Sequence, residues 1–333
     1  MAVTGANKAP AIWVLADDRA GNRRQCLGVA DALGIDYHVK EIAYGPWAAL
    51  PNVVLGASFS GLTADSRLGI HSPWPDVVIG AGRRTAPVAR KIRALAKRNG
   101  SDCFLVQVMD PGAGRGDFGL IAVPRHDGPV SGGNILSITG APHQLTRSRL
   151  DDEARLWQGR FDALAKPWIA LIAGGSTRRR TFTPGMARDL AERASNMAEQ
   201  SGGSLLVSTS RRTGSAADDL IDAITAPKIV FRWGESGENP YHAYLAMAEA
   251  VIVTGDSTSM CSEACSGTGP VYIFSPDALT APKHARLHAD LYERGYARPL
   301  GSGVEGGGFE AWSHEPLNAA DDVARAIRDR LGL

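Results

Sequence analysis

The sequence predicts an α/β protein made of two Rossmann-like halves, each a doubly wound parallel sheet, that face one another across a cleft. Three observations lead to this fold class. Short apolar runs alternate with longer amphipathic segments along the whole chain. The short runs are apolar at successive positions, which is typical of strands buried on both faces, as in parallel sheets. The length of 333 residues suits two domains of about 150 residues each better than one.

The first half is expected to contain six strands and two main helices. The strands are predicted at residues 11–16, 37–42, 76–80, 103–108, 119–123 and 135–138, and the helices at 22–33 and 84–98. Alternation of this kind implies parallel strands that are joined by right-handed crossovers.

The second half repeats the same alternation. Its strands are predicted at 168–173, 204–209, 228–232, 250–254 and 270–274, and its helices at 184–200, 215–225, 240–248, 258–266 and 283–293. Thr183-Pro184 favours a helix start, because the hydroxyl can cap the first turn and proline suits the first helical position.

A polar stretch between the halves marks the domain boundary. Residues 143–165 are predicted to form a polar helix, and Lys166-Pro167 ends it ahead of the next strand. We therefore expect an N-terminal Rossmann-like domain at 1–160, a C-terminal one at 161–315 and a C-terminal helix within 316–333.

Composition argues against several classes of protein. Lys and Arg number 36 and Asp and Glu 35, so the formal net charge is +1, which disfavours a dedicated nucleic-acid-binding protein. Four cysteines are too few for a disulfide scaffold at this length, and they are expected to be small buried apolar residues. The apolar stretch 11–16 is too short for a signal peptide, and no run approaches the ~20 apolar residues that span a bilayer. A cytoplasmic location is therefore expected.

Several well-known catalytic and nucleotide-binding motifs are absent. Two G-x-G-x-x-G matches, at 114–119 and 301–306, neither follow a predicted strand nor open a predicted helix, so we interpret them as loops. There is no P-loop, G-x-S-x-G or H-E-x-x-H sequence. No D-x-D occurs either, which disfavours sugar transfer through a carboxylate-held metal, and no metal or cofactor is expected.

Ligands of open α/β sheets bind beyond the carboxyl ends of the strands, and this rule selects the loops that matter. In the second half these loops are rich in glycine, hydroxyl groups and arginine, which suit phosphate because backbone N–H groups and guanidinium forks donate to its oxygens. The candidate phosphate-binding residues are Gly174, Gly175, Ser176, Arg178, Arg211, Ser257, Thr258 and Ser259. The alternatives are that the hydroxyls only cap the following helix, that Arg178 belongs to a solvated surface run, and that the glycines only form a tight turn.

The corresponding loops of the first half supply the candidate catalytic residues. Asp18 ends the first strand and is our first candidate for a base that deprotonates an acceptor hydroxyl; its alternative is a cap of the helix at 22–33. His126 and Asp127 are second candidates. The residues expected on the acceptor side of the cleft are Gly21, Asn22 and Arg83.

The loops of the second half resemble those of glycosyltransferases of the two-Rossmann, or GT-B, type. The stretches 172–176 and 253–265 are similar to the corresponding parts of the peptidoglycan N-acetylglucosaminyltransferase. The resemblance implies a donor nucleotide on the C-terminal half, with its diphosphate at the start of the helix at 258–266 and its ribose held by Glu263. The alternative for Glu263 is an acid that merely complements the helix dipole.

A closer resemblance covers nearly the whole chain. Asp18-x-x-Gly21-Asn22-x-x-Gln25, Gly237-Glu238-Asn239-Pro240-Tyr241 and Thr254-Gly255-Asp256-Ser257-x-Ser259-Met260-x-Ser262-Glu263-Ala264 are similar to the Elm1-like mitochondrial-fission family. The resemblance adds Asn239 and Met260 to the expected nucleotide site. Bacterial members of that family carry a glycosyltransferase or a nucleotide-sugar epimerase label, and plant members are implicated in recruiting a dynamin-like division protein.

The sequence thus predicts a metal-independent glycosyltransferase that takes a nucleoside-diphosphate sugar as donor and an unidentified acceptor. A nucleotide-sugar epimerase on the same fold and a non-enzymatic adaptor related to mitochondrial-fission factors are the two alternatives. Peripheral membrane association through a lipid-linked acceptor and the oligomeric state are left open, and no nucleic-acid partner is expected.

Overall fold

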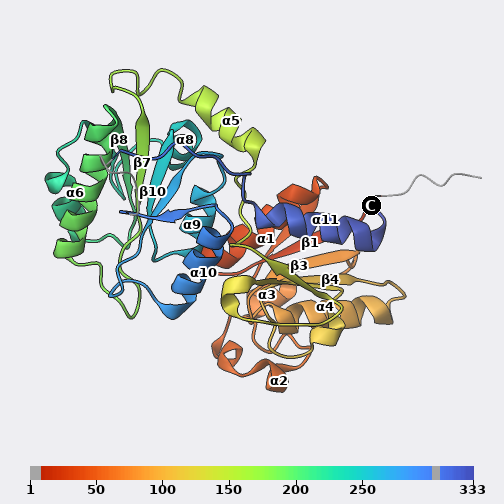
Figure 1. Ribbon diagram of the computed structural model, residues 1–333. Coiled ribbons are helices and arrows are strands. Elements are labelled where there is room, and N and C mark those ends of the chain that lie inside the picture. Colours follow the sequence, from red (N-terminus) through yellow and green to blue (C-terminus); the bar gives the residue numbers. More distant parts are fainter. Residues whose placement is uncertain (1–8, 302–307) are drawn as a thin grey trace, which may run out of the picture. The chain divides into compact units, whose positions relative to one another are not determined.

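The computed structural model describes residues 9–301 and 308–333, and it divides the chain into two compact units. The first unit is Met1–Gln144 with Ala319–Leu333, and the second is Leu145–Asn318. Each contains a six-stranded parallel sheet with helices on both faces, which confirms the predicted fold class (Figure 1). The predicted cleft between the halves stays a prediction.

The sheet of the first unit has the strand order β2-β1-β3-β4-β5-β6, and all its neighbouring strands are parallel. Its strands are β1 (Ile12–Ala16), β2 (Tyr37–Glu41), β3 (Val77–Ala81), β4 (Phe104–Val108), β5 (Leu120–Pro124) and β6 (Ile135–Ile138). The strand order reverses between β1 and β3, so the topological switch point of this sheet lies there.

Helices cover both faces of this first sheet. One face packs against α1 (Ala20–Leu33) and α11 (Ala319–Leu331), and the other against α4 (Ala86–Arg98) and the segment between β2 and β3. That segment, for which the sequence predicted no element, holds η1 (Pro46–Ala49), α2 (Asn52–Leu55) and α3 (Ala64–Leu68); the two remaining short helices of the unit are η2 (Arg115–Asp117) and η3 (Arg125–Asp127). Elements of three to five residues are too short for a helical period to show in the sequence.

The final helix returns to the first unit. Val323, Ala324 and Ile327 of α11 are fully buried in the same core as Ile12 and Val29 of β1 and α1. The predicted C-terminal helix therefore exists, and its apolar face completes the core on one side of the first sheet.

The structure divides the chain earlier than the sequence predicted. The boundary falls after residue 144 instead of after residue 160, because Leu150, Trp157 and Phe161 pack into the core of the second unit. The helix expected over 143–165 is also shorter: α5 spans Arg147–Leu156 and gives way to turns. Thr146 caps it by accepting a hydrogen bond from the Arg149 amide at 3.2 Å.

The sheet of the second unit has the order β12-β11-β10-β7-β8-β9 and is again parallel throughout. Its strands are β7 (Trp168–Ala173), β8 (Ser204–Thr209), β9 (Lys228–Phe231), β10 (Ala250–Thr254), β11 (Val271–Phe274) and the unpredicted β12 (Arg298–Pro299). The winding reverses between β7 and β10, which places the second switch point at their carboxyl ends.

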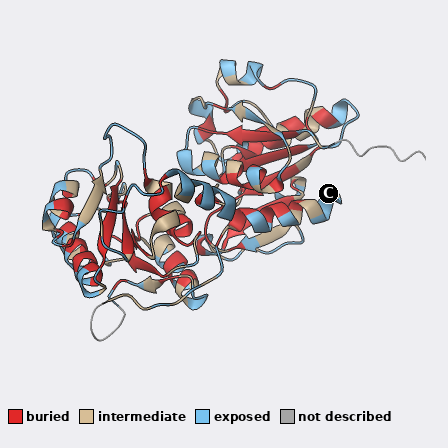
Figure 2. Cartoon of the chain, turned by 90° about the horizontal axis from the view of Figure 1, so that it is seen from above, coloured by how far each residue is buried: buried red, intermediate tan, exposed pale blue. Residues whose placement is uncertain are grey.

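Helices α6 (Pro184–Gln200) and α7 (Ala216–Ala223) cover one face of this second sheet. The other face packs against α5, α8 (Tyr241–Met247), α9 (Thr258–Ala264) and α10 (Pro282–Glu293). The Thr183 hydroxyl accepts from the Met186 amide at 3.3 Å, so the predicted start of α6 is confirmed. Figure 2 shows the result in both units, with buried strands inside and the exposed faces of the helices outside.

Other predictions concern the cysteines, the membrane and the glycine motifs. All four cysteines are buried and unpaired, as expected. No helix in the described ranges is long and apolar enough to cross a membrane. The glycine match at 114–119 lies around the short η2 turn, and most of the match at 301–306 falls outside the described residues.

Candidate functional site

The loops that leave β7, β8 and β10 are joined by hydrogen bonds at the switch point of the second unit. The Gly174 amide donates to Thr254 Oγ1 at 2.7 Å. The Gly174 carbonyl accepts from Ser210 Oγ at 2.7 Å and from Thr213 Oγ1 at 2.5 Å. Both backbone groups of Gly174 are therefore held, one by the end of β10 and the other by the loop that follows β8. We call this arrangement, residues 174–176, 210–213 and 254–257, the cradle.

A buried ion pair lies within the cradle. Arg212 Nη2 is 2.8 Å from Asp256 Oδ2, and the Asp256 side chain is fully buried while 31% of the Arg212 side chain is exposed. Arg212 Nη1 also donates to the Asp256 carbonyl at 3.3 Å. Neither carboxylate oxygen of Asp256 has an aligned hydrogen-bond donor within the described residues. Because an unpaired buried charge is costly, Asp256 keeps Arg212 at the cradle.

Both glycines of the loop are required by close packing. A Cβ on Gly174 would lie 2.5 Å from Asp256 Oδ1, and Gly175 has a φ of +138° with the carbonyl of Arg212 against it. The Gly175 amide has no protein acceptor in the part of the chain that the structure describes. The loop is thus more than a tight turn, because it leaves a backbone donor at the carboxyl edge of the sheet.

The predicted hydroxyl residues divide into two groups. Ser176 Oγ accepts from the Phe182 amide at 3.0 Å, and Ser257 Oγ accepts from the Met260 amide at 3.4 Å, so both shape the local backbone. For Ser257 this is the helix cap that we stated as the alternative. The half-buried hydroxyls of Thr258 and Ser259 have no protein partner among the described residues.

The cradle arginine is not the one that the sequence singled out. Arg178 and Arg211 are exposed, and neither takes part in an ion pair with another described residue. Arg212, the neighbour of Arg211, holds the buried carboxylate and lies 3.8 Å from Met260 Sδ. For Arg178 the surface alternative therefore fits the structure.

A hydrogen bond joins two of the motifs that carry the family resemblance. The Tyr241 hydroxyl donates to Glu263 Oε2 at 2.6 Å, and Glu263 is only 5% exposed. The Asn239 side chain accepts from the Tyr241 amide at 3.0 Å and so shapes the turn ahead of α8. Glu263 is the sixth residue of α9, beyond the first turn, so the dipole alternative does not fit.

Two histidines of α10 belong to the surroundings of the cradle. His288 Nε2 donates to the Gly255 carbonyl at 3.0 Å, and its ring occupies the space that a Cβ on Gly255 would need. Burial lowers the pKa of His288 to about 4, so the ring is neutral near pH 7. Burial also lowers the pKa of His284, while the charge of Asp256 opposes that shift.

The first unit also has an Asp–Arg pair at its switch point. Asp17, whose side chain is fully buried, accepts from the Arg19 amide at 3.1 Å and from Asn22 Nδ2 at 3.1 Å, and Arg84 Nη2 lies 3.3 Å from it. Asp18 is 61% exposed and pairs with the same Arg84. The Asp18 side chain does not cap α1, which begins at Ala20, so that alternative is excluded.

Arg84 is enclosed on several sides. Its guanidinium lies 4.3 Å from the ring centroid of Tyr44, and burial is the main cause that raises the pKa of that phenol. A hollow of about 510 Å³ beside this cluster is lined by Asp17, Asp18 and Glu41. Arg23 also lines the hollow and pairs with Glu41, so carboxylates and a guanidinium face it together.

The remaining first-unit predictions lie elsewhere. The Arg83 guanidinium donates to the carbonyls of Leu50 and Ala48, so it holds the segment between β2 and β3 instead of an acceptor. Gly21 lies in the exposed first turn of α1. His126 and Asp127 follow β5, which is three strand spacings, about 14 Å, from β1. The structure therefore does not bring them together with Asp18.

The family model described as mitochondrial fission ELM1 matches residues 20–331, nearly the whole chain. The chain belongs to the ELM1 family. The mitochondrial fission protein ELM1 of Arabidopsis thaliana is 30% identical to it over 302 residues, which cover 84% of this chain and 69% of that protein.

Solved structures with low sequence identity share the fold of this ELM1-family chain. The glycotransferase of kitacinnamycin matches with a TM-score of 0.55 and 16% identity, covering 98% of this chain and 94% of that one. A UDP-N-acetylglucosamine 2-epimerase matches with a TM-score of 0.50 and 13% identity, covering 97% and 95%. The two-unit architecture is therefore the GT-B fold, which serves both transferases and epimerases.

Sequence reasoning missed several residues of the ELM1-family chain that lie at the carboxyl edges of its sheets. They are Asp17, Arg84, Arg212, Asp256, His284, His288 and Trp233. Trp233 follows β9, its amide donates to Thr209 Oγ1 at 2.9 Å, and it is 60% exposed. A tryptophan directly after a predicted strand was a signal that the sequence offered, and its exposure in the structure marks it for a ligand because large apolar side chains are costly to leave in water. No group of three or more potential metal ligands occurs within the described residues.

Proposed function

We propose that this ELM1-family protein is a metal-independent glycosyltransferase whose second unit binds a nucleoside-diphosphate sugar. The observation that carries the proposal is the cradle, with the open Gly175 amide and with Arg212 held beside it by a buried carboxylate. Its position at the switch point between β7 and β10 supports the proposal, because ligands of doubly wound sheets bind there.

The diphosphate is assigned to the Gly175 amide and to Arg212. A guanidinium held by Asp256 through part of its fork still has N–H groups for a phosphate oxygen, and 31% of the side chain is open to solvent. The same charge would stabilise the diphosphate as it leaves. We therefore assign no metal ion and no cofactor to the reaction.

The nucleoside is assigned to Glu263 and Trp233. One oxygen of Glu263 accepts from Tyr241, which orients the carboxylate toward hydrogen bonding with the ribose hydroxyls. The exposed indole of Trp233 offers a face on which a base can stack, a contact worth ~1–3 kcal/mol. Neither contact selects one base, so the nucleotide is to be found by measurement.

The acceptor is assigned to the first unit, with Asp18 as the base. In the reaction the anomeric C–O bond to the diphosphate breaks and the bond to the acceptor oxygen forms. The proton of the acceptor hydroxyl goes to the Asp18 carboxylate. The exposure of Asp18 and its position at the rim of this hollow support the assignment.

A binding screen tests the proposal. Thermal-shift and calorimetric titrations of UDP, GDP, CDP and ADP should find one nucleotide that raises the melting temperature, because ligand binding stabilises the native state. Binding of none of them would contradict the proposal and favour the adaptor. Incubating the matching sugar nucleotide with the enzyme and no acceptor then distinguishes the two activities. Formation of an epimerised sugar nucleotide would show an epimerase and not a glycosyltransferase.

A further inference from the structure

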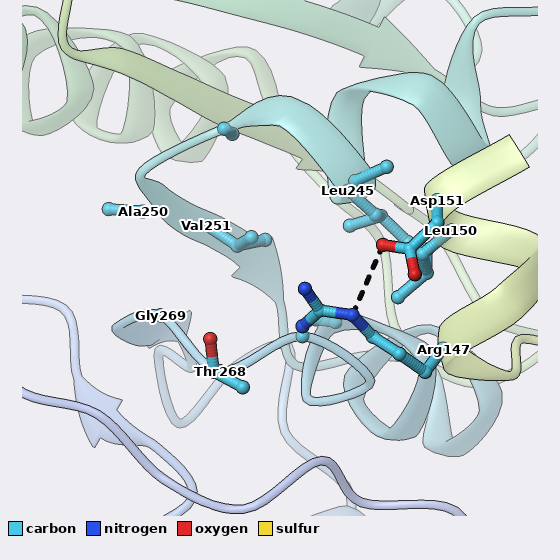
Figure 3. A pocket seen from close by; sticks show the side chains of 12 residues that line it. Arg147, Leu150, Asp151, Leu245, Ala250, Val251, Thr268 and Gly269 are labelled. Carbon is cyan, nitrogen blue, oxygen red and sulfur yellow. Dashed lines mark hydrogen bonds and ion pairs between the residues drawn. The ribbon is translucent and has the colours of Figure 1, made fainter. Parts of the chain in front are cut away.

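The two ends of β10 differ in how their positive charges are balanced. At the amino end, in the pocket that Figure 3 shows, Arg147 Nε donates to Asp151 Oδ1 at 3.1 Å, so this arginine has its own carboxylate. At the carboxyl end the carboxylate of Asp256 is paired with Arg212, and two further cations act on the same surroundings. Among these groups cations outnumber carboxylates, so an anion is matched better at the carboxyl end.

Helix α10 places a histidine at that end of the sheet. The strands that α10 joins, β11 and β12, are parallel, so the helix runs back along the sheet from its carboxyl edge. His288 Nε2 donates to the carbonyl of Gly255, the residue directly after β10. His284 is one helical turn, about 5.4 Å, nearer to the start of α10 and on the same face. Its ring therefore lies beyond the end of β10, on the side where the diphosphate is assigned.

The ring of His284 has hydrogen-bonding capacity that the protein does not use. His284 is half-buried, and neither of its ring nitrogens has a hydrogen-bond partner among the described residues. Nδ1 is also shielded from solvent. Buried polar groups of native proteins nearly always have a partner, so a group without one indicates that something else completes its surroundings.

The charges around His284 keep its ring neutral in the free protein. Burial is the main cause that lowers the pKa of His284, and the cations Lys283, Arg212 and Arg180 lower it further, while Asp256 opposes the shift. These cations come from three segments, namely the start of α10 and the loops after β8 and β7. The ring is therefore neutral near pH 7 although it lies near a carboxylate.

A diphosphate at the cradle would change this balance. Its negative charge would offset the surrounding cations, and one of its oxygens would give His284 the hydrogen-bond acceptor that it lacks. The other histidine on this face, His288, is already bound to the Gly255 carbonyl. We propose that His284 is a further ligand of the diphosphate and that it takes up a proton from solvent when the diphosphate binds. This inference rests on the proposed function, because it needs a nucleoside diphosphate at the cradle.

Calorimetry of the full chain tests the proton uptake. The nucleoside diphosphate found in the screen is titrated at pH 7 into the wild type and His284→Gln, in buffers that differ in ionisation enthalpy. The dependence of the binding enthalpy on the buffer should show more proton uptake by the wild type than by the variant. The variant is the reference because the terminal phosphate of the nucleotide can itself titrate near pH ~6.

Affinities test the contact itself. His284→Gln should weaken diphosphate binding about tenfold at pH 6 and by a smaller factor at pH 8, because a charged donor binds phosphate more strongly than a neutral one. Affinity for the parent nucleoside, which has no phosphate, should not change. The melting temperature should also stay the same, since the ring has no hydrogen bond to lose. His284→Asn is a second variant with the same expected result.

The matched control is His38→Gln. His38 is an exposed residue of β2 in the first unit, so its replacement should change neither affinity nor proton uptake. If no nucleoside diphosphate binds the wild type, the proposed function fails and this inference with it. If one binds, but with equal proton uptake and equal affinity in the wild type and both His284 variants, only the role of His284 is overturned. An equal loss of nucleoside affinity would also overturn it, because the ring would then support the site without contacting phosphate.

Discussion

The two units carry the same pair of side chains at their switch points but surround it differently. In the first unit the buried Asp17 receives hydrogen bonds from Arg19 and Asn22 in addition to Arg84. In the second unit the equally buried Asp256 has Arg212 beside it and no aligned donor within the described residues. The first carboxylate is well satisfied, whereas the second depends on one arginine.

The arginines differ in the same direction. Arg84 is 16% exposed, holds both Asp17 and Asp18 and packs on Tyr44, while Arg212 is 31% exposed and holds one carboxylate. A guanidinium with few hydrogen-bond partners binds a new acceptor more favourably. A fully paired guanidinium must first break one of its existing hydrogen bonds. The comparison indicates that the first pair fixes the loop and the second pair is suited to bind a ligand.

The largest expected effect separates the two aspartates of the first unit. If Asp18 is the base, Asp18→Asn should lower turnover by ~10²–10⁴-fold and leave nucleotide affinity unchanged. Asp17→Asn should instead lower the melting temperature, because a buried partner of Arg84 loses its charge. Steady-state kinetics and thermal melts of both variants check this; wild-type turnover in Asp18→Asn would remove it from catalysis.

A pH series tests whether a group beside the switch point of the second unit makes the stability of the protein sensitive to acid. The pKa of His288 is about 4 in the native state and near 6.5 in the unfolded chain, so the unfolded chain binds more protons between these values. The contribution to stability is therefore complete above about pH 6.5 and is lost as the pH falls toward 4, a change of about 3 kcal/mol.

Denaturant titrations from pH 7 to pH 4 measure that slope. His288→Gln retains a donor for the Gly255 carbonyl but does not titrate, so its free energy of unfolding should fall less steeply over the same range. Equal slopes for the variant and the wild type would show that another group controls acid sensitivity.

Neutralising each arginine tests the difference between the two pairs directly. Arg212→Gln should weaken binding of the nucleotide found in the screen by about 10–100-fold, the range for lost charged hydrogen bonds. Arg211→Gln should bind normally because Arg211 is exposed, and Arg84→Gln because it lies on the other unit. Calorimetry of the three proteins decides; a loss confined to Arg211→Gln would restore the original sequence prediction.

The smallest expected effect is no change at all. Nucleotide affinity should survive EDTA, because the proposed positive charge at the cradle comes from Arg212. A large loss with EDTA that Mg²⁺ or Mn²⁺ restores would contradict metal independence and would require a carboxylate-held ion in place of the arginine.

The sheets were predictable because buried parallel strands are apolar at nearly all positions. β1, β7 and β10 are buried along their whole length, and their sequences show it. Helix starts with a hydroxyl and a proline, as at α6, were equally clear. The segment at 43–75 was not predictable, because its helices are too short to show a period. Tertiary contacts hold η1 and α2, such as the hydrogen bonds that join Arg83 to Ala48, Leu50 and Asn52.

The site could be predicted to the loop but not to the side chain. The rule about carboxyl ends found the loops that hold Asp17, Arg84, Arg212 and Asp256. The rule could not choose between neighbouring residues of a loop, because their side chains point in different directions. A loop also has no repeating apolar pattern that would show which side chain is buried. The sequence therefore pointed to Arg83 and Arg211, each one residue before the arginine that pairs with a buried aspartate.

Helix α11 has a consequence for the order in which the chain is made. Its side chains Val323 and Ile327 complete the core of the first unit, although about 170 residues of the second unit lie between them and the rest of that core. A ribosome releases the whole second unit before it releases α11. The second unit can therefore fold first, and the core of the first unit is completed only after α11 has emerged.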